Sequence, residues 1–227
     1  RYSTAGGSLL EHAQPLVVRG DTPALAHNGN LPSTKALEAF LSERGVPTKN
    51  FSDSRLIAEA ISAHMDDGLS VEDAVAATYP LMTGAFSIVI LVADKLIALR
   101  DAHGIRPLSL ARLNGGFVVS SETCALSPMG ATFLPDIGAG EMIVLSEQGL
   151  TSRQLSPRKE QLDAFEFVYF SRTDSTLLGQ SVYRVRRRFG AILAREANVE
   201  VDIVVPVPET GIPVAAGFAE AAGVTYE

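Results

Sequence analysis

Two asparagines bracket a glycine in the stretch Ala26–Leu31, directly after the apolar run Pro23–Ala26. A side-chain amide and a bare backbone N–H can together donate hydrogen bonds to an oxyanion, which forms when a carbonyl carbon is attacked. The simpler interpretation is a tight turn, because Asn and Gly both tolerate positive φ. Asn28 and Gly29 therefore leave a choice between a turn and an oxyanion site.

Two further polar clusters suit recognition of a free amino acid. Arg1 begins one cluster, and an arginine can bind an α-carboxylate through two parallel hydrogen bonds. Asp53 lies in the other, and a carboxylate can bind an α-ammonium group. Together with Asn28 and Gly29 they suit an amino acid with an amide side chain. Spacing alone favours the simpler interpretation, in which Arg1 lies on the surface and Asp53 only caps a helix.

The other candidates for chemistry carry weaker signals. Cys124 is the single cysteine, flanked by small and apolar residues, and we expect it to be buried as a small apolar side chain. The four histidines show no spacing typical of a metal site. They are His12, His27, His64 and His103.

Composition indicates a folded protein of 227 residues, 46% hydrophobic and 20% charged. A net charge of −7 argues against nucleic acid as a partner. The basic cluster Arg184–Arg188 is typical of the solvent-exposed face of a helix. A lone cysteine excludes an internal disulfide, and no apolar run is long enough to cross a membrane. We therefore expect a cytoplasmic protein, and both ends of the sequence look like those of a fragment.

The first 160 residues predict helices followed by antiparallel hairpins. Apolar spacing predicts a helix over Ser33–Leu41, a second capped by Ser52 or Asp53, and a third capped by Ser70. Alternating and apolar runs with turn residues between them predict the strands. These are Ala85–Ala93, Leu96–Leu99, Leu108–Leu113, Phe117–Ser120, Met142–Leu145 and Leu150–Leu155.

A polar stretch at Pro157–Asp163 predicts a domain boundary, and the order beyond it is βαβα. We expect a strand at Phe165–Phe170, a helix over Ser181–Ala197, a buried strand at Val201–Val205, and a last helix through Ala222. The inward face of the first helix is predicted to hold Val182, Val185, Phe189, Ile192 and Leu193. The sequence thus divides into residues 1–160 and 161–227.

Several short motifs occur in the same order as in the class II, N-terminal-nucleophile glutamine amidotransferases. These are Arg1–Gly6, Ala13–Leu16, Ala26–Leu31, Gly84–Ser87, Arg100–Leu108 and Ser121–Ala125. Two later stretches, Phe165–Ser175 and Val204–Gly211, resemble the amidophosphoribosyltransferases within that class. The resemblance covers essentially the whole chain.

This resemblance implies a fold and an activity. Residues 1–160 would form the glutamine amidotransferase domain, an α+β, N-terminal-nucleophile hydrolase-type αββα sandwich. Residues 161–227 would begin a type I phosphoribosyltransferase α/β domain. The implied reaction converts glutamine, phosphoribosyl pyrophosphate (PRPP) and water into 5-phosphoribosylamine, glutamate and pyrophosphate, the first step of de novo purine synthesis. The implied assembly is a homo-oligomer, usually a tetramer.

The family also implies roles for matched residues. For glutamine, Arg1 would bind the carboxylate with Thr4 beside it, Asp53 would bind the ammonium group, and Asn28 and Gly29 would form the oxyanion hole. For the pyrophosphate of PRPP, the implied residues are Glu209, Thr210 and Gly211. Without the resemblance, that loop is more simply a strand-to-helix connection.

The sequence departs from the family in several respects, of which two bear on the nucleophile and on a cofactor. The nucleophilic N-terminal cysteine is expected upstream of Arg1, and Cys124 cannot replace it because it is internal. Asp163 stands where many members carry a cysteine that binds an iron–sulfur cluster, so we predict no such cluster, while Mg²⁺ is expected with PRPP. The alternative is a non-catalytic homologue that binds glutamine or a partner subunit, and we expect the chain alone to lack glutaminase activity.

Overall fold

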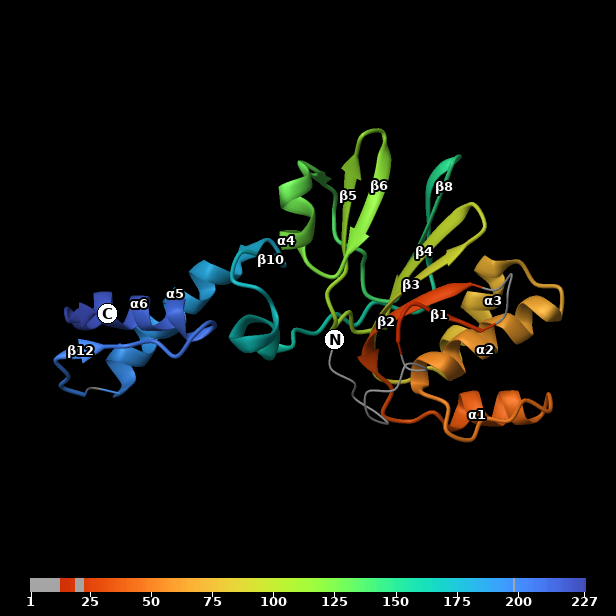
Figure 1. The fold of residues 1–227 in the computed structure, drawn as a ribbon, viewed down its shortest axis with the longest axis horizontal. Coiled ribbons are helices and arrows are strands. Elements are labelled where there is room, and N and C mark those ends of the chain that lie inside the picture. Colours follow the sequence, from red (N-terminus) through yellow and green to blue (C-terminus); the bar gives the residue numbers. More distant parts are fainter. Residues whose placement is uncertain (1–12, 19–22, 198) are drawn as a thin grey trace. The chain divides into compact units, whose positions relative to one another are not determined.

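The computed structural model describes residues 13–18, 23–197 and 199–227, which form two compact units (Figure 1). The first unit contains residues up to Leu110 together with Pro135–Leu162. The second contains Ala111–Leu134 together with Asp163–Glu227. The units separate near the predicted boundary at residue 160, but Ala111–Leu134 groups with the C-terminal segment. Assignment of a function to each part stays a prediction.

The first unit is built on a six-stranded sheet in which every neighbouring pair is antiparallel. The strand order is β1-β2-β3-β4-β8-β9. The strands are β1 (Leu16–Val17), β2 (Ala24–Asn30), β3 (Ala85–Val92), β4 (Lys95–Arg100), β8 (Glu141–Ser146) and β9 (Gly149–Gln154). Strands β3, β4, β8 and β9 confirm the predicted apolar and alternating runs.

A second sheet has three strands in the order β6-β5-β7. Strands β5 (Ser109–Leu113) and β6 (Gly116–Ser120) form the hairpin predicted at Asn114-Gly115. Both turn residues have positive φ, 51° and 83°, as a two-residue hairpin loop requires. The short strand β7 (Thr132–Phe133) pairs with the other edge of β5.

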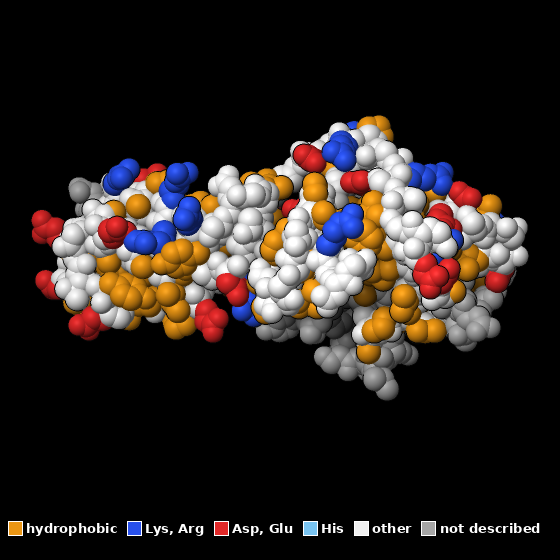
Figure 2. All heavy atoms as spheres, turned by 90° about the horizontal axis from the view of Figure 1, so that it is seen from above, with side chains coloured by type: hydrophobic (Ala, Val, Ile, Leu, Met, Phe, Trp, Pro, Cys, Tyr) orange, Lys and Arg blue, Asp and Glu red, His pale blue; other side chains and the backbone are white. Residues whose placement is uncertain are grey.

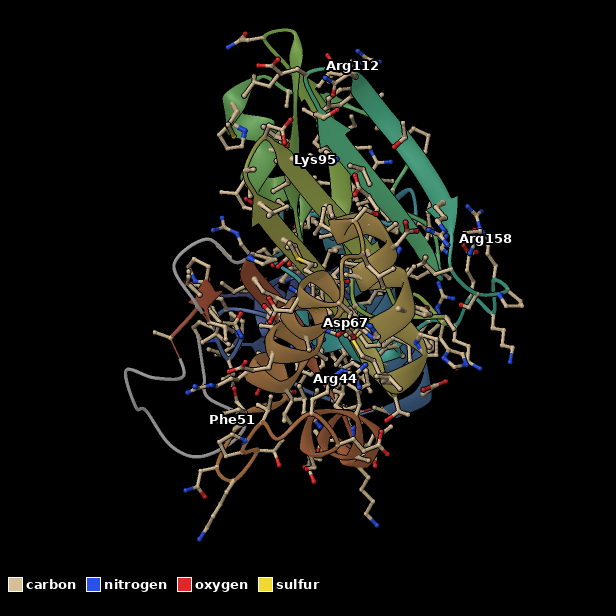
Figure 3. The ribbon with its side chains drawn as sticks, turned by 90° about the vertical axis from the view of Figure 1, so that its right-hand side faces the viewer. Arg44, Phe51, Asp67, Lys95, Arg112 and Arg158 are labelled. Atoms are coloured by element: carbon tan, nitrogen blue, oxygen red, sulfur yellow. The ribbon has the colours of Figure 1, made fainter. Side chains whose placement is uncertain are left out.

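Helix α2 (Asp53–Asp66) packs on strands β1 and β2 of the six-stranded sheet, and α1 (Lys35–Ser42) and α3 (Val71–Thr78) pack against α2. The 3₁₀ turn η2 (Tyr79–Leu81) follows α3. Ser52 and Ser70 are the N-caps of α2 and α3, each accepting a backbone N–H with its side chain. Leucines and isoleucines of these helices form one core with β2, β3 and β4. Arg44, after α1, bonds Asp67, after α2, at 2.9 Å (Figure 3).

The rest of the second unit consists of short strands and helical turns together with two longer helices. They are α4 (Thr123–Leu126), η3 (Ser127–Met129), η4 (Glu166–Phe170), β10 (Thr176–Leu177), β11 (Gln180–Ser181), α5 (Val182–Ala197), β12 (Ile203–Val204), α6 (Gly211–Ala222) and β13 (Thr225–Tyr226). Strands β12 and β13 are parallel with α6 between them in sequence, which is a βαβ unit. Helices α5 and α6 pack closely because Gly190 and Gly217 leave no Cβ at the crossing.

The prediction of a strand at Phe165–Phe170 was wrong. Residues Glu166–Phe170 form a single π-helical turn, closed by a hydrogen bond from Ser171 N to Glu166 O at 3.0 Å. Arg186, which is fully buried, donates to Phe167 O and Ser171 O at 2.7 Å each. These bonds replace the ladder partners that a strand would need, and they come from a residue far along the chain.

Two burial predictions for the second unit were also wrong. The strand expected at Val201–Val205 is short, and its Ile203 is 47% exposed. On α5, Val182 is buried, but Phe189, Ile192 and Leu193 are 37–48% exposed. The apolar residues of α5 and β12 have the pattern of elements that neighbours cover on several sides. The C-terminal part of this unit has only one pair of parallel strands and two helices, so these side chains are left partly exposed. Figure 2 shows apolar side chains on the surface of this part.

Candidate functional site

Asn28 and Gly29 lie inside strand β2, so the interpretation of this pair as a turn is wrong. Asn28 pairs with Ser87 and Gly29 pairs with Phe86 on the neighbouring strand β3. Side chains alternate between the two faces of a strand. The imidazole of His27 contacts Ser54 of α2, and the amide of Asn28 contacts Arg106. The two side chains therefore occupy opposite faces of β2.

Gly29 has no room for a side chain. A Cβ at this position would lie 2.2 Å from Ala85 O and 2.7 Å from Phe86 Cα, and the φ of Gly29 is +157°. Both obstacles are backbone atoms of β3 and cannot rotate away. The strand pairing thus requires glycine here, and the same absence of a side chain leaves the backbone open to close approach.

Asp53 lies against both ends of the Asn28-Gly29 segment. It is the first residue of α2, after the N-cap Ser52. Its Oδ2 accepts a hydrogen bond from Leu31 N at 3.4 Å and lies 3.7 Å from His27 Nδ1, while its Oδ1 accepts from Ser54 N at 2.6 Å. Folding therefore brings this sequence-predicted carboxylate next to the predicted oxyanion residues.

The carboxyl of Asp53 is held in its charged form. Burial raises its pKa, but the hydrogen bond and charge of His27, with the backbone N–H groups of Ser54 and Leu31, outweigh burial and lower the pKa to about 2. Its side chain keeps 15% exposure. Asp53 can thus present a negative charge to a cationic group throughout the physiological pH range.

A buried hydrogen-bond network orients His27. Ser54 Oγ donates its one proton to Asp53 Oδ1 at 3.2 Å and accepts from Gln14 Nε2 at 3.1 Å. His27 Nδ1, 3.0 Å from the same oxygen, must therefore be the donor of that pair. Gln14 Oε1 also accepts from His27 N at 2.8 Å. Sequence reasoning assigned no role to His27, Gln14 or Ser54, although His27 and Gln14 lie in motifs that carry the family resemblance.

Arg106 is the other supporting residue that sequence reasoning missed. Its Nη2 donates to Oδ1 of Asn28 at 3.1 Å across 78 positions of sequence. The only sequence signal was its place in the Arg100–Leu108 motif, and that motif does not indicate which residue Arg106 contacts. Asn28 is thus bonded from a loop that follows β4.

The remaining predicted residues fall elsewhere. Arg1 and Thr4 lie outside the described residues. Cys124 is half-buried rather than buried, because α4 is a single turn whose buried position belongs to Leu126. In the described part of the chain, no three His, Cys, Asp or Glu side chains gather as metal ligands. Over the same residues, no helix combines the length and apolarity needed to span a bilayer.

Glu209 and Thr210 end the connection from β12 to α6 in the second unit, and Gly211 is the first residue of α6. Thr210 is the N-cap of α6 and its side chain makes no capping bond, while Ile212 N donates to Glu209 O at 3.2 Å. Thr210 and Gly211 border a hollow of about 400 Å³ whose other lining residues are apolar. The loop therefore combines the start of a twelve-residue helix with an open hollow.

A family model described as a glutamine amidotransferase domain matches residues 5–128. The chain belongs to this family. The matched segment contains β2, with Asn28 and Gly29, and the start of α2, with Asp53. The glutamine amidotransferase assignment thus covers every described residue that we place near the oxyanion pair.

Relatives of this glutamine amidotransferase chain extend the match to its whole length. The amidophosphoribosyltransferase of Synechocystis sp. is 42% identical over 233 aligned positions, covering 100% of this chain and 47% of that protein. The chain spans about half the length of the curated relatives it matches.

Two solved structures share the fold across the whole chain. One is the glutamine PRPP amidotransferase of Bacillus subtilis complexed with ADP and GMP, 34% identical with a TM-score of 0.90 over 50% of its length. The other, described as the allosteric regulatory enzyme of purine biosynthesis, is 36% identical with a TM-score of 0.92 over 49% of its length. These matches confirm the predicted fold class, an N-terminal-nucleophile hydrolase-type α+β sandwich followed by the start of an α/β domain.

Proposed function

We propose that the protein containing this chain is a glutamine-dependent amidophosphoribosyltransferase. It would convert glutamine, PRPP and water into 5-phosphoribosylamine, glutamate and pyrophosphate, at the start of purine synthesis. The observation that carries the proposal is the placement of the charged Asp53 beside Asn28-Gly29 in a glutamine amidotransferase domain. Relatives that match the whole chain bear the amidophosphoribosyltransferase name.

The glutaminase half-reaction needs an attacking thiol and a place for the oxyanion. An N-terminal cysteine thiol attacks the side-chain amide carbon of glutamine, and the carbonyl π electrons move onto oxygen. Asn28 Nδ2 and Gly29 N–H donate hydrogen bonds to that oxygen. The thiol proton passes to the amide nitrogen by way of the cysteine's own α-amino group, so the tetrahedral intermediate expels ammonia. Water then hydrolyses the thioester to glutamate and restores the thiol. Cys124, internal and in the other compact unit, is not the nucleophile in this proposal.

Substrate binding in this proposal relies on opposite charges at the two ends of glutamine. Asp53 binds the α-ammonium group, and its low pKa keeps it charged at every pH at which the enzyme would work. Arg1 binds the α-carboxylate with Thr4 beside it. An amino acid bound at both charges presents its side-chain amide to Asn28 and Gly29.

The second half-reaction would use the loop Glu209–Gly211. Ammonia attacks C1 of the ribose and pyrophosphate leaves, so the loop must stabilise an anion. Backbone N–H groups at the start of α6 suit a diphosphate oxygen. Mg²⁺ is expected to bind through the substrate diphosphate, as it commonly does, and would neutralise the leaving group.

We propose that this chain holds no iron–sulfur cluster. Such a cluster is typically held by four thiolates, and this chain has one cysteine. Asp163, at the position of an expected ligand, instead uses Oδ1 to accept the backbone N–H of Phe165 at 2.9 Å. The expected homo-oligomer, usually a tetramer, and the cytoplasmic location stay predictions.

The proposal is tested on the purified full-length gene product with glutamine, PRPP and Mg²⁺. We expect glutamate and pyrophosphate to be released in equal amounts, and ammonium salts to replace glutamine. Glutamine binding without release of either product would contradict the proposed enzymatic activity and favour the non-catalytic alternative. Pyrophosphate release with ammonia alone would locate the failure in the glutamine site.

A further inference from the structure

Three residues line up across the sheet beside the oxyanion pair. Asn28 on β2 is the register partner of Ser87 on β3, and Ser87 is in turn the partner of Arg100 on β4. Residues directly opposite each other in antiparallel strands project to the same face of the sheet. Asn28, Ser87 and Arg100 thus form one row on one face, and all three contact Arg106.

The backbone of Arg106 is held by two members of this row. Ser87 Oγ donates to Arg106 O at 2.8 Å, and Arg100 Nε donates to the same carbonyl at 2.9 Å. Arg100 is 7% exposed and also donates to Ile137 O at 2.6 Å and to Gly104 O. The loop after β4 is therefore fixed to the sheet by bonds that do not involve the Arg106 side chain.

The side chain of Arg106 then determines which atom of Asn28 faces it. A guanidinium has five N–H donors and no acceptor. The Asn28 atom 3.1 Å from Arg106 Nη2 must therefore be the carbonyl oxygen, Oδ1. The amide nitrogen Nδ2 lies on the other branch of the planar group, away from Arg106.

We propose that Arg106 is a positioning residue that fixes the amide of Asn28 with its Nδ2–H₂ group toward the oxyanion. The inference rests on the proposed glutaminase function. The terminal torsion of asparagine is broad and roughly two-fold, so an unsupported amide can turn over. The reversed amide would place oxygen against the developing negative charge. A charge-assisted bond to Oδ1 also polarises the amide and strengthens its N–H donors.

This role predicts a specific kinetic signature. Asn28 donates to charge that develops in the transition state, so misplacing it lowers kcat more than it raises KM for glutamine. Removing a whole oxyanion donor costs about 100- to 1000-fold in kcat. Disordering one, without removing it, should cost about tenfold to a hundredfold.

The test uses the full-length protein with Arg106→Met, Arg106→Lys and the matched control Arg112→Met. Arg112 is exposed, lies 4.9 Å from the Phe117 ring and takes no part in the site (Figure 3). We expect Arg106→Met to lower kcat of glutamate release as stated, with KM within about twofold. The lysine variant, which keeps a donor, should recover part of the rate, and Arg112→Met should match wild type. Unchanged ammonia-dependent synthesis shows that the variants fold.

A double-mutant cycle tests whether Arg106 acts through Asn28. Because Asn28→Ala removes the amide, adding Arg106→Met should cause no further loss of kcat. An equal further loss, a rise in KM alone, or wild-type kinetics for Arg106→Met would overturn the inference.

Crystal structures of wild type and Arg106→Met give a readout that does not need turnover. We expect the Asn28 side chain to adopt a second orientation or lose order in the variant. A single, unmoved Asn28 would overturn the positioning role. A wild-type protein that releases no glutamate contradicts the proposed function, and the two crystal structures then decide the positioning role alone.

Discussion

Arg106 Nη2 donates a 3.1 Å hydrogen bond to Asn28 Oδ1 on one face of β2, while His27 contacts Asp53 and Ser54 on the other. Two consecutive residues of one strand thus contact two different segments. Asn28 contacts the loop after β4, and His27 contacts the start of α2. A change on either face should therefore have its own consequence for glutamine chemistry.

Gly29→Ala should separate β2 from β3 and abolish glutaminase activity. The new Cβ would lie 2.2 Å from Ala85 O, so the strands must shift, at a cost of about 1–3 kcal/mol in the free energy of unfolding. Gly116→Ala is the matched control, because its Cβ would meet nothing closer than Leu113 O at 3.6 Å. Chemical denaturation of both variants measures the difference, and equal stabilities would show that the close approach carries no cost.

Asp53→Asn should lower stability near neutral pH, and the loss should disappear in acid. The pKa of Asp53 falls from an ordinary 3.8 to about 2, so the folded state favours the charged form. This stabilisation, about 2 kcal/mol, is present above pH 4 and is lost as the pH falls from about 4 to 2. Denaturation of wild type and variant across that range measures it. A difference that grows on acidification would have the wrong sign.

The same substitution should raise KM for glutamine strongly while leaving ammonia-dependent synthesis intact, because only glutamine has an α-ammonium group to bind. The wild-type KM should not rise between pH 7 and pH 5 through Asp53, whose charge is constant over that interval. Parallel loss of both activities would count against the assigned role.

Arg186→Met should destabilise the second unit by about 3 kcal/mol, because it leaves buried carbonyls without donors. The lost bonds are those to Phe167 O, Ser171 O and Thr173 Oγ1, at 2.7–2.9 Å. Arg188→Met, two residues along the same helix but exposed, should change stability by less than about 0.5 kcal/mol. Hydrogen exchange of the η4 turn distinguishes the two, and equal protection would show that Arg186 does not hold it.

Iron and sulfide should be absent from the full-length protein at stoichiometric levels, whether it is purified with or without air. The reason is the replacement of an expected ligand by Asp163, whose Oδ1 binds a backbone N–H. Elemental analysis and the visible absorption of the purified protein measure the cluster. One iron–sulfur cluster per chain would contradict this prediction.

The elements that sequence predicted well are those specified by local pattern. Ser52 and Ser70 cap helices because a serine precedes each apolar stripe, and β3 is apolar along nearly its whole length. Phe165–Phe170 has the composition of a strand, but a buried arginine 19 positions after Phe167 satisfies the backbone of a π turn there. No local window contains that arginine.

The candidate site shows the same limit. Asn28, Gly29 and Asp53 could be chosen from residue type and motif, and folding brings them together. Arg106 could not be chosen, because its contact with Asn28 depends on the register of three strands and on a loop fixed by Arg100. A sequence shows which residues can donate a hydrogen bond, but it does not show which residue orients the donor.

Asn28→Ala in the full-length protein is the most direct test of an oxyanion role for this strand. With glutamine as nitrogen donor, kcat should fall about 100- to 1000-fold while KM changes little. With ammonium salts as donor, the rate of phosphoribosylamine synthesis should equal that of wild type. A variant that keeps wild-type kcat with glutamine would contradict the oxyanion role of Asn28 and, with it, the proposed glutamine site.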